Sequence, residues 1–357
     1  MYFFKLNNEK LKTLNMEQQA KNIIIEKIIN LIEKKSDEDI NWQAISQNPN
    51  LTMDYIEKNP DKPWDFYGIS QNPNLTMDYI EKNPDKDWNW YEISKNSNIT
   101  MEIIGDNPDK PWDIGGIAQN PNLKLETVDN NLDFPWNWDY ISIHPNITMD
   151  YIEKNLDFPW CWDYISFNPN LTMEMIKKYP DKGWDWWGIS KHQNITMEMI
   201  DKNPDKPWDS LYIPENPNLT MDYIEQNPDK DWNWDSLSYN PNLTIEYIEK
   251  FIEKPWNWYY LSKNDQLPIE IIEAYPEKSW YWCGISLNEN ITLDFIENNL
   301  DKDWDLYNLS INSFKKDYEI ELKKIRFERY HEELIKKSWH PKRFIDWCLD
   351  NDDDYHN

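Results

Sequence analysis

Carboxylates are the side chains in this sequence with the most obvious capacity for chemistry, and they recur at fixed positions. Asp61 and Asp65, for example, flank Lys62, Pro63 and Trp64, and similar pairs return along the chain. Closely spaced oxygens can bind calcium, but a dedicated calcium loop also needs a glycine at its sharp turn, which this segment lacks. A carboxylate placed before a helix can instead accept a hydrogen bond from an unpaired backbone N–H. The pattern therefore favours helix capping over metal binding.

Histidine and cysteine form no recognisable catalytic or metal-binding motif. His144 and His192 stand where similar stretches of the chain carry asparagine, so we expect them to replace asparagine in a turn. Cys161, Cys283 and Cys348 are far apart and odd in number, which fits neither a disulfide framework nor a zinc site. No Ser–His–Asp set or glycine-rich phosphate loop is visible. We therefore expect a protein that is not an enzyme, with no catalytic residue, no metal ligand and no cofactor.

The elements that carry these residues follow from a period of 24 residues. Eleven tryptophans fall into one column without an insertion or deletion, and an Ile-Ser pair first seen at Ile45-Ser46 recurs with them. The column is Trp64, Trp88, Trp112, Trp136, Trp160, Trp184, Trp208, Trp232, Trp256, Trp280 and Trp304. Exposed aromatic rows can bind sugars, but an aromatic fixed in every unit is typical of the interface between repeats. We therefore expect these tryptophans in the core.

Each unit contains two signals for the start of a helix. Asp or Asn follows the column tryptophan in most units, and Thr recurs before a Met-Asp-Tyr-Ile-like segment; both are good N-caps. The residue before a proline is pushed out of the α region, so Asn72-Pro73 and Asn83-Pro84 should end the helices. In the second unit the pattern predicts helices over residues 66–71 and 77–82. The second helix should bury Met77 and Ile80.

Helices this short are unstable alone, so each unit must be held by its neighbours. The sequence predicts an all-α solenoid of about eleven to twelve two-helix repeats over residues 40–312. Residues 1–39 should supply an amphipathic capping helix over 16–35. Residues 313–357 should supply a C-terminal helical cap over 314–338, a break at 339–341, a short segment at 343–349 and an acidic tail from 350. Layers about 10 Å apart would make a rod or superhelix on the order of 100 Å long, which we expect to be a monomer, with an oligomer as the alternative.

The formal charge is −28, from 37 Lys and Arg against 65 Asp and Glu, and it belongs almost entirely to the repeats. Nucleic-acid affinity comes largely from basic residues that displace counterions, so DNA and RNA are poor partners. No stretch is apolar enough for a membrane span, and the first residues lack the pattern of a secretory signal. We expect an intracellular, soluble protein, in the host cytoplasm or the virion if it is viral.

A partner surface is expected where the units differ from one another. The variable columns after the second aromatic and after the Ser are rich in aromatic side chains, which are favoured at protein interfaces. The candidates are Tyr67, Tyr91, Tyr140, Phe167, Trp187, Tyr212, Tyr239 and Tyr259. The alternative is that these columns are loosely constrained surface or slack in the core.

Residues 69–80 read Ile-Ser-Gln-Asn-Pro-Asn-Leu-Thr-Met-Asp-Tyr-Ile, which resembles the leucine-rich repeat variant family, with its 24-residue unit and Asn-Pro turn. That resemblance implies alternating α and 3₁₀ helices in a right-handed superhelix. The chain differs from that family in having tryptophan where the family usually has valine. It also lacks the cysteine cluster that could hold an iron–sulfur centre, so no iron–sulfur role is carried over.

A closer likeness is to tandem repeat proteins of giant, Mimivirus-like viruses of amoebae. The matching segments are 74–76 (Asn-Leu-Thr), 203–209 (Asn-Pro-Asp-Lys-Pro-Trp-Asp) and 339–344 (Trp-His-Pro-Lys-Arg-Phe). The likeness implies origin and shape, and no activity.

These observations favour a non-catalytic scaffold for protein–protein interaction. Its acidic surface would steer a basic protein partner, which would then dock on the variable aromatics. One alternative is a glycan-binding or virion-structural module that uses Trp and Tyr as platforms. Another is an acidic mimic of nucleic acid that sequesters a basic protein.

Overall fold

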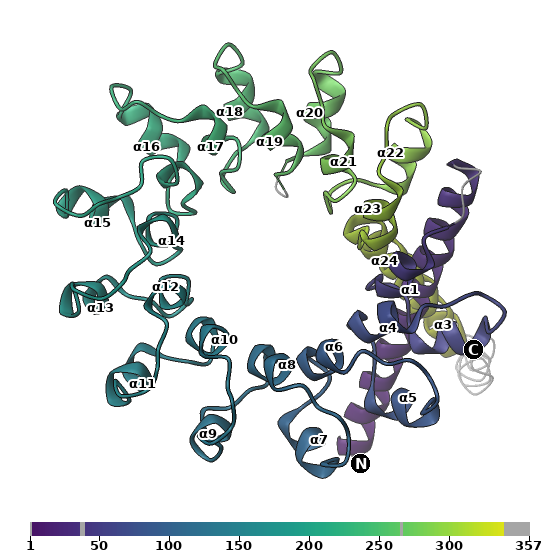
Figure 1. Cartoon of the computed structure of the whole chain (residues 1–357). Helices are drawn as coiled ribbons and strands as arrows, with labels where there is room; N and C mark the ends of the chain where they lie inside the picture. The colour runs from purple at the N-terminus through teal and green to yellow at the C-terminus, as the bar shows by residue number, and fades with distance from the viewer. Residues whose placement is uncertain (1, 36–39, 265–266, 339–357) are drawn as a thin grey trace, which may run out of the picture.

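A computed structural model of the protein describes residues 2–35, 40–264 and 267–338 and contains helices but no strand in this part of the chain. Two long helices, α1 (Tyr2–Lys35) and α24 (Lys315–Ser338), enclose a regular series of short ones. The series alternates between an inner and an outer layer (Figure 1). The predicted all-α repeat solenoid is confirmed.

The inner layer starts each unit with the helix that follows the tryptophan column. Its members are α2 (Trp42–Gln47), α4 (Phe66–Gln71), α6 (Trp90–Lys95), α8 (Ile114–Gln119), α10 (Trp138–Ile143), α12 (Trp162–Ile165), α14 (Trp186–Ser190), the 3₁₀ helix η1 (Ile213–Glu215), α17 (Trp234–Leu237), α19 (Trp258–Ser262), α21 (Trp282–Ile285) and α23 (Leu306–Ile311). Pro214 lies inside η1, where it interrupts the helix pattern of the other units.

The outer layer completes each unit with a helix of five or six residues. Its members are α3 (Met53–Lys58), α5 (Met77–Lys82), α7 (Met101–Asp106), α9 (Leu125–Asp129), α11 (Met149–Lys154), α13 (Met173–Lys178), α15 (Met197–Lys202), α16 (Met221–Gln226), α18 (Ile245–Lys250), α20 (Ile269–Ala274) and α22 (Leu293–Glu297). The helix α24 begins where the period places the next outer helix, so it completes the twelfth unit.

The predicted caps account for where these helices begin. Asp65 accepts a hydrogen bond from the backbone N–H of Gly68, and Thr76 accepts one from that of Tyr79. The helices predicted over 66–71 and 77–82 have those bounds, and Met77 and Ile80 are buried as expected. Cys161 and Tyr281 interrupt the Asp/Asn column, and neither makes a side-chain cap.

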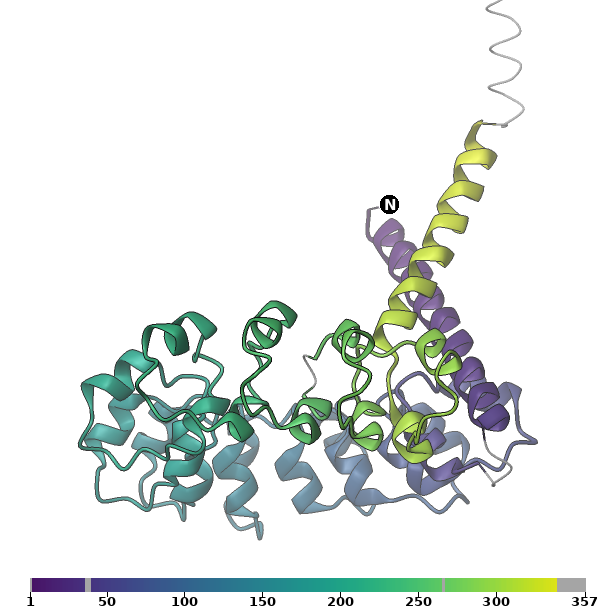
Figure 2. The same cartoon turned by 90° about the horizontal axis from the view of Figure 1, so that it is seen from above.

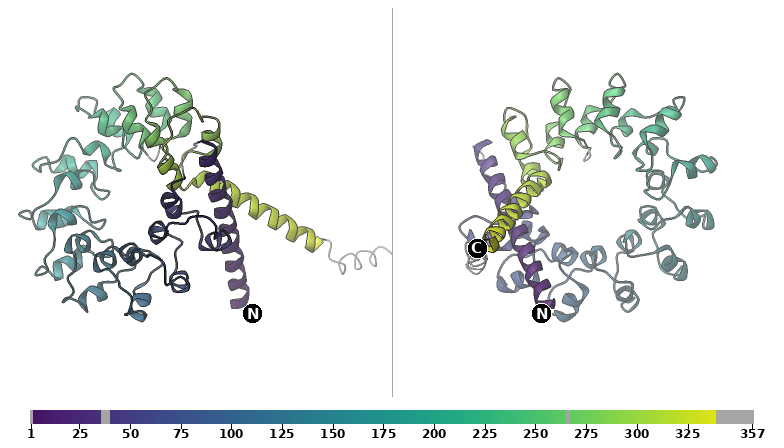
Figure 3. Two further views of the ribbon diagram at one scale, coloured as in Figure 1. Left: turned by 45° about the vertical axis from the view of Figure 1, so that its right-hand side comes forward. Right: turned by 180° about the vertical axis from the view of Figure 1, so that it is seen from behind.

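The expected rod is wrong, because the stack bends through a full circle and closes (Figures 1 and 3). The first inner helix, α2, packs against the last, α23. Asn48 of the first unit donates hydrogen bonds to the carbonyls of Ser310 and Asn312 in the twelfth. Twelve units that share a circle equally turn by about 30° each, which is a small rotation per repeat of the kind that curves all solenoids. The repeat pattern alone does not predict a rotation of this size between neighbouring units.

The two long helices cross at the junction and project from one face of the ring (Figure 2). The expected capping helix over 16–35 is part of α1, but α1 begins at Tyr2 and covers more than the first unit. It packs against α22 of the eleventh unit and against α23 and α24 of the twelfth as well. Its isoleucines Ile24, Ile25 and Ile28 are fully buried in the same core as Ile45 and Leu309. The break at 339–341, the segment at 343–349 and the acidic tail from 350 lie outside the described residues.

Candidate functional site

Most of the invariant positions of the repeat serve to join one unit to the next. The first Asn of the Asn-Pro-Asn turn is buried and donates from its side-chain amide to carbonyls of the preceding unit. Asn216, for example, reaches the carbonyls of Ser190, His192 and Ile195 at 2.9, 3.2 and 3.0 Å. The Ser of the Ile-Ser pair bonds in the opposite direction, since Ser190 Oγ accepts from the N–H of Asp209. These residues are therefore committed to the architecture.

The buried amides form a ladder that runs once around the molecule and returns to its start. Its twelve members are Asn48, Asn72, Asn96, Asn120, His144, Asn168, His192, Asn216, Asn240, Asn264, Asn288 and Asn312. His144 lies 2.9 Å from the carbonyl of Asn120 through Nε2, and its Nδ1 accepts from the N–H of Asn146. The histidines therefore replace asparagine, as expected, and are not free to bind a metal. Burial lowers the pKa of both His144 and His192.

The column tryptophans also belong to the interfaces, which confirms their expected place in the core. The second aromatic of one unit meets the column tryptophan of the next edge to face, with ring centroids 5.2 Å apart for Trp42 and Trp64. Trp258 and Trp280 repeat this geometry at 4.9 Å. Each column tryptophan donates its indole N–H to the carbonyl that ends the preceding outer helix, as Trp64 does to Asn59 at 2.8 Å.

The variable aromatic positions behave differently, because the structure brings most of them together on the inner layer. Tyr91 and Tyr140 come from units that are not adjacent, and a hydrogen bond between their side chains raises the pKa of Tyr140. The unit between them supplies Gly115, where a side-chain carbon would lie 3.7 Å from the Tyr91 ring, an ordinary contact distance. Gln119, which lies in the same unit as Gly115, donates a hydrogen bond to the hydroxyl of Tyr91.

A second cluster joins Phe167, Trp187 and Tyr212 from three successive units. The ring of Trp187 lies 5.1 Å from that of Phe167 and 5.3 Å from that of Tyr212. A side-chain carbon at Gly188 would lie 2.7 Å from the Phe167 ring, so this packing requires glycine there. Lys191 places its ammonium 4.0 Å from the centre of the Trp187 ring.

A third cluster contains Tyr239 and Tyr259 together with two residues that the sequence did not single out. Tyr260 lies 4.6 Å from Tyr239, and Tyr281 lies 4.5 Å from Tyr259, between ring centroids. Lys263 places its ammonium 4.3 Å from the centre of the Tyr259 ring. Tyr260 shares a variable column with Tyr140 and Tyr212, so it could have been found. Tyr281 stands in the capping column, where an aromatic residue is an exception.

We call these three clusters the aromatic belt. It comprises Tyr91, Tyr140, Phe167, Trp187, Tyr212, Tyr239, Tyr259, Tyr260 and Tyr281, all on or directly beside the inner helices. Trp187 and Tyr259 are 38% and 40% exposed, and Trp187 is the only tryptophan of the described chain that is classed as exposed. Tyr67 is also exposed, at 46%, but makes no ring contact with the belt. The structure therefore joins seven of the eight candidates and leaves Tyr67 apart.

The two layers differ in charge. The inner helices and the residue after each carry five acidic residues and three lysines. The outer layer carries the acidic columns, such as Asp78 and Glu198 near the starts of outer helices and Asp61 and Asp181 in the loops, all exposed. Most of the net charge of −28 therefore surrounds the ring rather than lining it.

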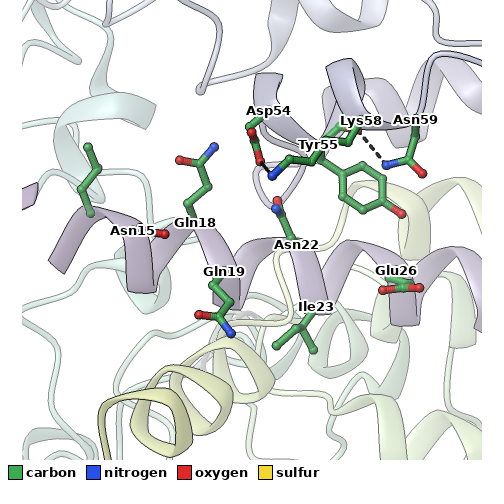
Figure 4. A pocket seen from close by; sticks show the side chains of 11 residues that line it. Asn15, Gln18, Gln19, Asn22, Ile23, Glu26, Asp54, Tyr55, Lys58 and Asn59 are labelled. Atoms are coloured by element: carbon green, nitrogen blue, oxygen red, sulfur yellow. Dashed lines mark hydrogen bonds and ion pairs between the residues drawn. The ribbon is translucent and has the colours of Figure 1, made fainter. Parts of the chain in front are cut away.

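A separate groove of about 880 Å³ lies between α1 and α3 (Figure 4). Amide side chains dominate its lining, among them Asn15, Gln18, Gln19 and Asn22. Asn22 already accepts a hydrogen bond from Thr52 at 2.8 Å. The charged residues of its lining include Asp54 and Lys58, which form an ion pair at 2.7 Å. It belongs to the junction that closes the ring.

No group of three or more His, Cys, Asp or Glu side chains suited to a metal occurs among the described residues. None of the described helices is both long and apolar enough to cross a membrane. Comparison with protein-family models, with curated proteins and with solved structures finds no match. The resemblances to the leucine-rich repeat variant family and to the giant-virus repeats therefore stay predictions.

Proposed function

We propose that this protein is a non-catalytic scaffold that binds a protein partner with a basic surface through the aromatic belt. One observation carries the proposal. The invariant residues are used to build the ring, whereas most of the aromatic residues at variable positions gather into three clusters on its inner layer. In a solenoid, positions that differ between units can determine which partner is bound, and Tyr and Trp are favoured at protein interfaces.

The charge of the outer layer supports a basic partner. Exposed carboxylates around the ring attract positive charge over a distance of about a Debye length, roughly 10 Å at moderate salt. The belt itself suits cationic groups, because the rings of Trp187 and Tyr259 already lie under lysine ammonium groups of the same chain. The carboxylates of the outer layer would first attract the basic partner, which would then dock on the aromatic belt.

The proposal is tested by capturing proteins from a lysate with three baits and eluting each with rising salt. The baits are the wild type, the belt variant W187A/Y259A and the control variant F327A/Y330A, which removes two exposed aromatics from α24. We expect a basic protein that the wild type and the control retain and the belt variant loses. Equal recovery by all three baits, or release that does not depend on salt, would contradict the proposal.

The exposed ring of Trp187 among tyrosines keeps the glycan-binding alternative as a second candidate. Stacking of a sugar on Trp187 would change its fluorescence, whereas the other described tryptophans are at least partly buried in the interfaces. Titration with soluble oligosaccharides, with W187F as the control, separates the two proposals. A response that W187F loses would favour the glycan.

A further inference from the structure

The interface that closes the ring, which we call the seam, differs from the other eleven in one respect. The twelfth unit meets the first there without a peptide connection between them. The ladder bonds are the same as elsewhere, since Asn48 reaches the carbonyl of Ser310 at 2.6 Å and Asn50 reaches that of Ser313 at 2.7 Å. Every other interface is also held by the chain passing through it. The seam is therefore the place where the ring can open without unfolding a unit.

The helix α1 lies across the seam and holds both sides. On the first side Asn22 accepts from Thr52, and Lys21 donates to Asn74 at 2.7 Å. On the other side its lysines reach the end of the eleventh unit, directly before the twelfth. Lys34 pairs with Glu297 at 3.3 Å, and Lys35 donates to the carbonyls of Leu300 and Lys302 at 2.9 Å. The Lys34–Glu297 pair is exposed, where ion pairs are weak and screened by salt. The contacts of Lys21 and Asn22 are partly buried, and the fully buried isoleucines of α1 pack in the core that both sides of the seam share.

The inner layer limits what can reach the belt. An exposed side chain on an inner helix points toward the central opening or toward one of the two faces of the ring, because neighbouring units flank it and the outer helices lie behind it (Figure 1). Helices packed about 9 to 10 Å apart around a circle of twelve leave an opening about 25 Å wide, once the thickness of a helix is subtracted. That width admits a single helix or a two-stranded coiled coil, whose helices are about 10 to 12 Å thick.

We propose that the ring encloses its partner, a helical rod with basic side chains, and that the seam is the entrance. The inference rests on the proposed function, because it places the partner on the aromatic belt. Inner helices such as α10, α12 and α14 are seen nearly end-on in Figure 1, so a helical rod lying in the opening would be parallel to them and would meet the belt on that side along its length. Inside the ring, five acidic residues against three lysines favour a basic rod, whose cations would compete with Lys95, Lys191 and Lys263 for the belt rings that these lysines already contact.

The first test asks whether the seam opens before the rest of the ring. Hydrogen exchange of backbone amides is measured for the wild type and for two matched double variants. N48A/N50A removes the ladder bonds at the seam, and N168A/N170A removes the equivalent bonds at an interface that the chain crosses. We expect the seam variant to speed exchange at least tenfold in α1, α2 and α23 only. The interior variant should leave those helices unchanged. If the amides of α1, α2 and α23 exchanged at the same rate in both variants, the proposal that the seam is the entrance would be overturned.

The second test asks whether the rod lies inside the ring. The probe is a synthetic two-stranded coiled coil with arginine on its outer positions, prepared with both ends blocked by streptavidin or with one end free. A carbodiimide condenses a lysine amine with a carboxylate in contact with it, so the Lys34–Glu297 pair can be joined covalently. That amide bond would close the ring permanently. In the control K27R/K34R, arginine replaces the lysines of the Lys27–Glu321 and Lys34–Glu297 pairs, so the carbodiimide forms no amide bond at either pair. The ring of this control can therefore still open and release the rod.

The expected results differ between the two probes. The untreated ring should bind both rods. A ring that is closed before the rod is added should bind only the rod with a free end, which can thread through the opening. A ring that is closed after binding should remain on the blocked rod in concentrated salt. If the closed ring bound the blocked rod, and the variant W187A/Y259A lost that binding, the rod would lie on the belt without being enclosed. This result would overturn enclosure and leave the proposed function standing. Failure of every form to bind either rod would overturn the assignment of a basic helical rod as the partner.

Discussion

The two histidines of the ladder make the stability of single units depend on pH. Burial lowers the pKa of His144 and His192 below the ordinary value near 6.5, so the unfolded chain binds protons more readily than the folded one. Stability is therefore complete above the unfolded pKa and falls as the pH drops through about 6.5 and below. A protonated ring would also aim an Nδ1 proton at the N–H of Asn146 or Asn194.

Replacing both histidines by asparagine, the residue of the other ladder positions, should remove this dependence. We expect H144N/H192N to equal the wild type in stability at pH 8 and to exceed it at pH 5.5. Urea unfolding at the two pH values measures the difference, and carboxylates common to both proteins cancel. A constant difference across this range would contradict the prediction, because it would mean that the folded and unfolded chains bind protons equally at these histidines.

The ladder asparagines should be among the least replaceable residues. N216A leaves three buried carbonyls of the preceding unit without their donor, which we expect to cost about 2 kcal/mol of unfolding free energy. The exposed Gln226 provides the comparison, because Q226A removes an amide that faces solvent. Chemical denaturation of the two variants should separate them clearly, and a loss below that of Q226A would count against the ladder.

At the scale of the helix, the caps that are missing can be restored. Cys161 precedes α12 without a side-chain cap, at a position where Asn137 caps α10 through the N–H groups of Asp139 and Tyr140. C161N should supply the missing acceptor and raise stability by about 1 kcal/mol. The reciprocal variant N137C should lose a similar amount. Thermal unfolding of both tests whether the column acts through capping, and a destabilised C161N would show that the thiol packs better than the amide.

The sequence allowed the elements to be predicted almost residue by residue, because caps and Asn-Pro stops act locally. The bounds of α4 and α5 depend on Asp65, Thr76 and the prolines that follow. Tyr140 and Tyr212 could be proposed as surface for the same reason, since they depart from the repeat. Their grouping with Tyr91 or Trp187 depends on packing between units, which no single unit encodes. Closure depends on a rotation summed over twelve interfaces, so it lay beyond prediction.

For the whole molecule, the acidic outer layer should make stability increase with ionic strength. A net charge of −28 on a compact ring repels itself, and salt screens this repulsion more than it weakens the exposed ion pairs. We expect the unfolding temperature to rise by several degrees between low and moderate sodium chloride. Circular dichroism follows the transition, with sodium sulfate as a check at matched ionic strength. A falling midpoint would show that the lysine pairs of α1 dominate.

Closure also changes what a single backbone cut can do. The loop at Asp181 and Lys182 is exposed on the outer layer, and a protease that cleaves there divides the chain into two pieces. In an open stack such pieces would share one interface. In the ring they share two, the one at the cut and the seam, and α1 and α24 still cross between them. A nicked molecule should therefore migrate as two fragments in denaturant and as one particle in native buffer.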